Sequence, residues 1–124
     1  MGGALKFSVE LCLEFIRRTI ASNRGRSPEL KSGALTFAVE AASGLTDYFT
    51  VFITEDDVVL KPGAAPLSWV GPLVTVFVRE DLLSGIMHGG PLTGTDVMGD
   101  TQLLSLIALT FGHGIEPSPA TTNR

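Results

Sequence analysis

A stretch near the carboxyl end, Thr95–Phe111, constrains the fold more than any other part of the chain. It predicts a short strand, a tight corner at Gly99-Asp100 and then a helix. Asp100 suits the N-cap of that helix, because a carboxylate can accept a backbone N–H there and lies at the positive end of the helix dipole. The helix itself is apolar almost all the way round, so we expect several of its sides to be covered. A sheet would cover one side; another helix, a lipid-like ligand or a partner chain would cover the rest.

The length of 124 residues allows one domain with a core of its own. We expect the domain to span residues 1–114 and the Pro- and Thr-rich residues 115–124 to form a flexible tail. The formal net charge of −4 argues against nucleic acid as a partner, because phosphates require a basic surface. No apolar run approaches the roughly 20 residues that cross a membrane, and the amino end lacks signal-peptide features. We therefore expect no stable membrane insertion and a cytoplasmic location.

Candidate residues for chemistry are few. Cys12 is the single cysteine and falls within an apolar helical pattern, which indicates a core residue and not a nucleophile. His88 and His113 each lie beside glycines at expected helix ends, where a capping role is usual. Asp96 and Asp100 have no histidine or third carboxylate at ligand spacing. The sequence therefore predicts no catalytic residue, no metal site and no cofactor.

The periodicity of apolar residues predicts a first helix over residues 5–21 and a series of strands. One face of the helix carries Leu5, Val9, Cys12, Ile16 and Ile20, widened by Leu11, Leu13 and Phe15. The strands are expected at residues 35–41, 47–54, 58–60 and 74–79, the first three forming an antiparallel meander.

A short helix is expected to follow the fourth strand. Glu80 and Asp81 place negative charge at its start, and it runs through Met87. The whole pattern predicts an α+β fold, a mostly antiparallel sheet with helices packed on one face.

Four segments taken together resemble the sterol carrier protein type 2 family. They are residues 29–39 (Glu-Leu-Lys-Ser-Gly-Ala-Leu-Thr-Phe-Ala-Val), 58–63 (Val-Val-Leu-Lys-Pro-Gly), 74–83 and 95–111. The resemblance covers about residues 5–112 and depends on the order of the elements and on the Gly-Asp corner. It implies a five-stranded sheet with an apolar tunnel between sheet and helices.

Members of this family bind sterols, fatty acids, acyl-CoA or other lipids, and the fold also occurs as an accessory domain of larger enzymes. This chain departs from the family between the short helix and the last strand. Only the glycine-rich residues 88–94 lie there, where members have a longer stretch with an extra helix over the tunnel. We therefore expect a smaller or more open groove.

The function predicted from these features is noncatalytic binding, or transfer, of a hydrophobic ligand such as a fatty acyl chain, a sterol or another lipid. The ligand would occupy an apolar pocket between sheet and helices. Its expected lining is Phe37, Val76, Leu82, Ile86, Met87, Met98, Leu103, Leu104, Ile107 and Phe111. The same residues would equally suit a filled core, because apolar side chains usually serve packing.

Two alternatives stay open at this point. The chain could be an interaction or dimerisation module, or an accessory domain of a larger enzyme system, without a ligand of its own. It could also be a small cavity enzyme that acts on a polycyclic substrate, with Asp96 or His88 as the base. Because no predicted helix is left to cover the outer sheet face, we expect a homodimer through that face around Phe77.

Overall fold

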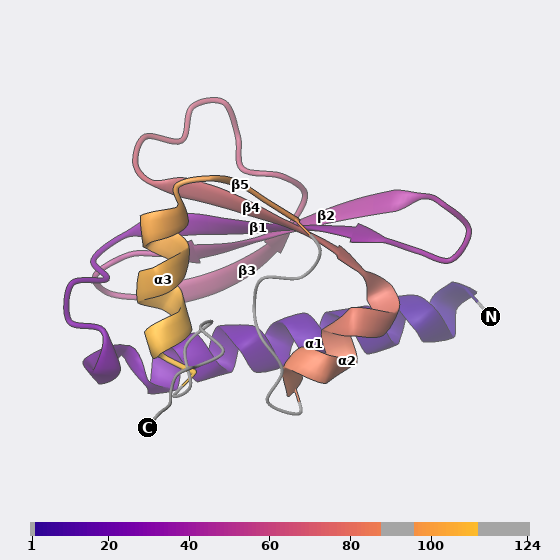
Figure 1. The fold of residues 1–124 in the computed structure, drawn as a ribbon, viewed down its shortest axis with the longest axis horizontal. Coiled ribbons are helices and arrows are strands. Elements are labelled where there is room, and N and C mark those ends of the chain that lie inside the picture. Colours follow the sequence, from indigo (N-terminus) through magenta and orange to yellow (C-terminus); the bar gives the residue numbers. More distant parts are fainter. Residues whose placement is uncertain (1, 88–95, 112–124) are drawn as a thin grey trace, which may run out of the picture.

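The computed structural model describes the backbone of residues 2–87 and 96–111 and the side chains of residues 9–83 and 96–111. The order of elements is the one that the sequence predicts (Figure 1). The helices are α1 (Gly2–Ser22), the short 3₁₀ helix η1 (Arg24–Arg26), α2 (Glu80–Met87) and α3 (Thr101–Leu109). The strands are β1 (Gly33–Glu40), β2 (Thr46–Ile53), β3 (Val58–Pro62), β4 (Leu73–Arg79) and β5 (Asp96–Gly99).

The five strands form one sheet in the order β3-β2-β1-β4-β5. Three strand pairs are antiparallel and one, β1 with β4, is parallel, which confirms the predicted mostly antiparallel sheet. The parallel pair arises because the chain leaves edge strand β3 and crosses the sheet before it enters β4. This crossing segment, residues 63–72, lies on one side of the sheet, and α1, α2 and α3 lie on the other (Figure 1). The prediction that the helices pack on a single face is confirmed.

The hydrophobic core lies between the helices and the sheet. Because side chains alternate along a strand, every second residue of each strand faces the helices. The buried strand residues on this face are Leu35, Phe37, Val39, Phe49, Val51, Ile53, Val58, Val74, Val76 and Val78. The helices add Val9, Cys12, Leu13, Ile16, Ile20, Leu83, Leu103, Leu104 and Ile107 to the same cluster.

Helix α1 differs from the prediction on one of its sides. Its buried face is the predicted one, but Leu11 and Phe15, expected to widen that face, are 51% and 36% exposed. At 3.6 residues per turn, Leu11 lies about 200° round the helix from Val9, so it cannot share the face that Val9 buries. The assignment of Leu11 and Phe15 to the core face was wrong.

Several element boundaries differ from the sequence prediction, and two of them have a clear physical reason. Strand β3 continues through Pro62, which lies opposite Phe49 in the ladder. A proline is tolerated there because β3 is an edge strand. Helix α3 ends at Leu109, two residues earlier than expected, and the Thr110 hydroxyl donates to the Ile107 carbonyl at 2.6 Å.

The Gly-Asp corner fixes where α3 begins. Gly99 has a φ of 106°, and a Cβ there would lie 2.5 Å from the Leu73 carbonyl oxygen, so no other residue fits without a shift of the backbone. Asp100 donates its backbone N–H to the same carbonyl at 2.9 Å, and its side chain accepts from the Leu103 N–H at 3.0 Å. This confirms the predicted cap, a feature worth about 1 kcal/mol. Leu103 then packs directly onto Gly33 of β1.

The outer sheet face is less open than the sequence suggests. Ala34, Thr36, Ala38 and Thr50 point to this face, and each is at most 3% exposed. The crossing segment contributes here through Trp69. Its ring packs against Phe52 with 5.4 Å between the centroids, and its Nε1–H donates to the Pro72 carbonyl at 3.1 Å. A loop thus covers part of a face for which no helix was available.

Two buried threonine hydroxyls connect β1, β2 and the start of the crossing segment. Thr50 donates to the Gly63 carbonyl at 2.8 Å, and the Thr36 and Thr50 hydroxyl oxygens lie 2.9 Å apart. A hydroxyl carries one proton, so Thr36 must be the donor to Thr50.

The direction of these hydrogen bonds predicts unequal costs of substitution. Thr50→Val should lower the free energy of unfolding by about 1–3 kcal/mol, because it leaves the buried Thr36 hydroxyl without its acceptor and removes the bond to Gly63. Thr36→Val should cost less, about 0.5–1.5 kcal/mol, because Thr50 still donates to Gly63. Urea denaturation of both variants measures the difference, and a larger cost for Thr36→Val would contradict the assigned direction.

Candidate functional site: a groove between α1 and β3

The ten residues expected to line a pocket do not all lie together. Five of them belong to the packed core, and none of these is more than 2% exposed: Phe37, Val76, Leu103, Leu104 and Ile107. Phe111 is partly buried and packs against that core. Ile86 and Met87 belong to α2, but their side chains lie outside the described residues.

The remaining two residues of the predicted lining are exposed. Leu82 of α2 is 43% exposed, and Met98 of β5 is 61% exposed. Met98 pairs with Thr75 in the ladder, while its neighbour Val97 pairs with Val76. Since alternate residues face opposite sides, Met98 lies on the outer face, away from Phe37 and Val76. The predicted lining stays a prediction, and the structure brings only its buried members together.

A different apolar surface opens at the other edge of the sheet, where α1 lies beside β3. Three neighbouring pockets follow this edge, and we call them together the α1–β3 groove. The central pocket, of about 360 Å³, is lined by Glu10, Leu11, Glu14, Phe49, Leu60 and Pro62. The acidic pocket, of about 510 Å³, is lined by Glu10, Thr46, Asp47, Tyr48, Phe49, Pro62, Gly63 and Ala64. The third pocket, of about 380 Å³, is lined by Glu14, Arg17, Asp57, Val58, Val59 and Leu60.

The central pocket is the apolar part of the groove. Leu11 of α1 and Phe49, Leu60 and Pro62 of the sheet line it. Phe49 and Leu60 belong to the helix-facing side of the sheet, so the pocket is the open edge of the interface that holds the core. Sequence reasoning missed this site because it placed Leu11 in the core. The angular distance of Leu11 from Val9 was the signal that could have revealed it.

The carboxylates along the groove differ in how they are paired. Glu14 accepts from Arg17 at 2.6 Å and from Arg18 at 3.2 Å, and Arg17 also donates to the Val58 carbonyl at 3.2 Å. The Arg17 hydrogen bonds hold the pKa of the Glu14 carboxyl below its usual range. The ion pair therefore persists at neutral pH, and its stabilising effect is lost as the pH falls through that lowered pKa.

Glu10 forms no ion pair with any residue of 9–83 and 96–111. The same holds for Asp47, which lines the acidic pocket beside it. Neither the central nor the acidic pocket has a lysine or arginine among its described lining residues.

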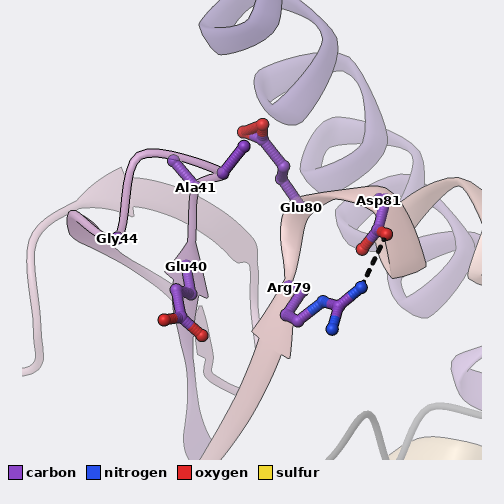
Figure 2. A pocket seen from close by; sticks show the side chains of 7 residues that line it. Glu40, Ala41, Gly44, Arg79, Glu80 and Asp81 are labelled. Carbon is purple, nitrogen blue, oxygen red and sulfur yellow. Dashed lines mark hydrogen bonds and ion pairs between the residues drawn. The ribbon is translucent and has the colours of Figure 1, made fainter.

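A further pocket, of about 370 Å³, lies where β1 and β4 end side by side (Figure 2). Glu40 and Arg79 are neighbours in the parallel ladder, but the guanidinium is turned toward Asp81 and donates to it at 3.1 Å (Figure 2). This hydrogen bond lowers the pKa of the Asp81 carboxyl, which makes it a poor proton acceptor at neutral pH. Four of its seven lining residues are charged (Glu40, Arg79, Glu80 and Asp81), and it offers no large apolar side chain to a hydrophobic ligand.

The described residues contain little reactive machinery. Cys12 is buried, and burial raises the pKa of its thiol, the opposite of what a nucleophile needs. The Asp96 carboxylate accepts from the Val97 N–H at 2.9 Å. His88 and His113 lie outside the described residues. Within residues 2–87 and 96–111 no group of three metal-binding side chains comes together, and no helix there is long and apolar enough to span a membrane.

Comparison with protein-family models and with curated proteins finds no match. Solved structures do match. Sterol carrier protein 2 like 2 from Aedes aegypti superposes with a TM-score of 0.56 at 20% identity, over 79% of this chain and 91% of that chain. The apo form of sterol carrier protein 2 from Yarrowia lipolytica gives a TM-score of 0.47 at 11% identity, over 64% and 72% of the two chains. The first likeness confirms that the chain has a sterol-carrier-protein-2-like fold, as the sequence resemblance predicts.

Proposed function

We propose that the protein binds a hydrophobic small molecule without catalysing a reaction, and that the α1–β3 groove is where the ligand enters and rests. The observation that carries this proposal is the apolar central pocket at the open edge of the sheet–helix interface. The fold adds support, because the Aedes aegypti structure that shares it is named a sterol carrier protein. The scarcity of placed acids, bases and nucleophiles among the described residues favours binding over chemistry.

The physical basis of binding would be the removal of apolar surface from water. Leu11 is half exposed, although it lies beside the partly buried Leu60 and the buried Phe49. An aliphatic chain that packs against these three residues would remove their apolar surface and its own from water. Each Å² of apolar area removed from water contributes about 25 cal/mol, so about 200 Å² gives about 5 kcal/mol before the cost of association.

The interior lining predicted from the sequence is a second location for the same ligand. Phe37, Leu104 and Ile107 are fully buried and packed, so a ligand there would need the core to open. The groove needs no such rearrangement. A ligand that enters at Leu11 could also extend inward, because Phe49 belongs both to the groove and to the core cluster.

Leu11→Gln should weaken the binding of a neutral, environment-sensitive dye such as Nile red about fivefold. The loss of about 40 Å² of apolar contact corresponds to about 1 kcal/mol, or a factor of about five. Leu109→Gln is the matched control, since Leu109 is also a half-exposed helical leucine, 47% exposed, but lies on α3 away from the groove. Fluorescence titration measures both affinities.

Mass spectrometry of small molecules extracted from the purified protein completes this test. A hydrophobic compound retained by the native protein and depleted in Leu11→Gln supports the proposal. Equal dye affinity for the native protein and for both variants would contradict binding in the groove. No dye binding and no retained compound would contradict the proposed function itself.

Self-association through the outer sheet face is a second candidate function. The exposed apolar side chains Leu73 and Met98, 38% and 61% exposed, favour it. They lie on the same face as Phe77, and Met98 pairs with Thr75, which lies between Leu73 and Phe77 on that face of β4. Contiguous apolar surface on a folded domain commonly marks an interface.

If the outer face forms a homodimer, sedimentation velocity at high micromolar concentration should show a dimer that Met98→Glu dissociates. The introduced carboxylate would be buried without a partner, which is strongly unfavourable. Leu109→Glu adds the same charge on the helical side of the molecule and should leave the dimer intact. A native protein that stays monomeric at the highest concentration would refute the homodimer.

A further inference from the structure

We propose that the α1–β3 groove selects single-chain amphiphiles with a cationic head group, such as a protonated amine or a quaternary ammonium, over fatty acids and other anionic lipids. This inference rests on the proposed function and specifies its ligand class. It follows from the way in which an apolar pocket and a negatively charged pocket adjoin in the same groove.

The two pockets share three lining residues: Glu10, Phe49 and Pro62. A molecule with its hydrocarbon chain against Leu11 and Leu60 in the central pocket would therefore carry its head group directly into the acidic pocket. The acidic pocket also has a volume of about 510 Å³, larger than the central one, so it has room for a substituted head group. The two volumes thus favour an amphiphile with a slender chain and a bulkier, substituted head group.

The charge at the head-group end is negative. Glu10 and Asp47 both line the acidic pocket, and neither forms an ion pair with a residue of 9–83 and 96–111. Further along the groove Glu14 is already paired with Arg17 and Arg18, so those cations are engaged with a carboxylate. A carboxylate or phosphate head group would meet two carboxylates that form no ion pair within the described side chains, whereas a cation would meet two counterions.

The preference rests on the carboxylates and not on an aromatic ring. Tyr48 also contributes to the wall of the acidic pocket, but it pairs with Ala38, so its side chain points to the outer face of the sheet. Asp47 and Glu10 lie on the helix side. These two carboxylates suit a cationic head group better than a neutral one.

Isothermal titration calorimetry with two probes of the same chain length tests this inference. The probes are dodecyltrimethylammonium and dodecanoate, and neutral dodecanol is the reference. All three are used below their micelle or solubility limits and at low ionic strength. Dodecyltrimethylammonium should bind about tenfold more tightly than dodecanoate, and the ratio should shrink as salt is added, because exposed charges are screened. Glu10→Gln and Asp47→Asn should each reduce the affinity for the cation about two- to fivefold.

Glu29→Gln is the matched control, because it removes one exposed carboxylate that lines neither pocket. It should leave the preference unchanged. A preference that keeps its full native size in both Glu10→Gln and Asp47→Asn, or that Glu29→Gln reduces as much as they do, would overturn the inference, because it would show an effect of overall charge. If dodecanoate or dodecanol binds as tightly as dodecyltrimethylammonium, the inference is overturned, while the proposed function stays intact. Failure of all three probes to bind would instead overturn the proposed function.

Discussion

The close approach of Gly99 to the Leu73 carbonyl determines how the second half of the molecule is assembled. A side chain at position 99 would meet that oxygen at 2.5 Å, so the contact exists only with glycine. The same carbonyl accepts the Asp100 N–H, which turns the chain out of the sheet edge and starts α3. Leu103 of α3 then packs on Gly33, where a side chain would clash with the Leu103 side chain. Two glycines and one capping aspartate thus allow an apolar helix to pack closely on the sheet.

This placement divides the helical layer between the two edges of the sheet. α3 lies against β4, and α1 lies against β3 (Figure 1). Between them the core is filled, because the side chains of β1 and β4 that face the helices are buried. At the β3 edge α1 leaves Leu11 uncovered, and there the interface opens as the α1–β3 groove. Among the described residues, the sheet–helix interface therefore opens at the α1–β3 groove.

Much of the fold could be predicted from the sequence, because the elements are set by local periodicity and by residues such as Gly99 and Asp100. The sheet face on which Met98 lies could not be predicted, because a shift of one residue in strand register moves a side chain to the opposite face. The parallel pairing of β1 with β4 depends on a crossing segment that has no periodicity of its own. Leu11 was assigned to the core face because Leu11, Leu13 and Phe15 together suggested a wide apolar face of the helix. Which part of that face is buried depends on how the helix packs on the sheet. The groove depends on these long-range contacts, so the sequence predicted a binding pocket but assigned its lining to other residues.

The central claim is that an apolar ligand lies in the α1–β3 groove, and nuclear Overhauser effects between protein methyl groups and bound dodecanol test it most directly. In a leucine- and isoleucine-methyl-labelled sample, we predict effects from the dodecanol chain to the methyl groups of Leu11 and Leu60. Effects confined to Leu104 and Ile107 would place the ligand in the interior and contradict the groove. The absence of any intermolecular effect at saturating dodecanol would contradict ligand binding altogether.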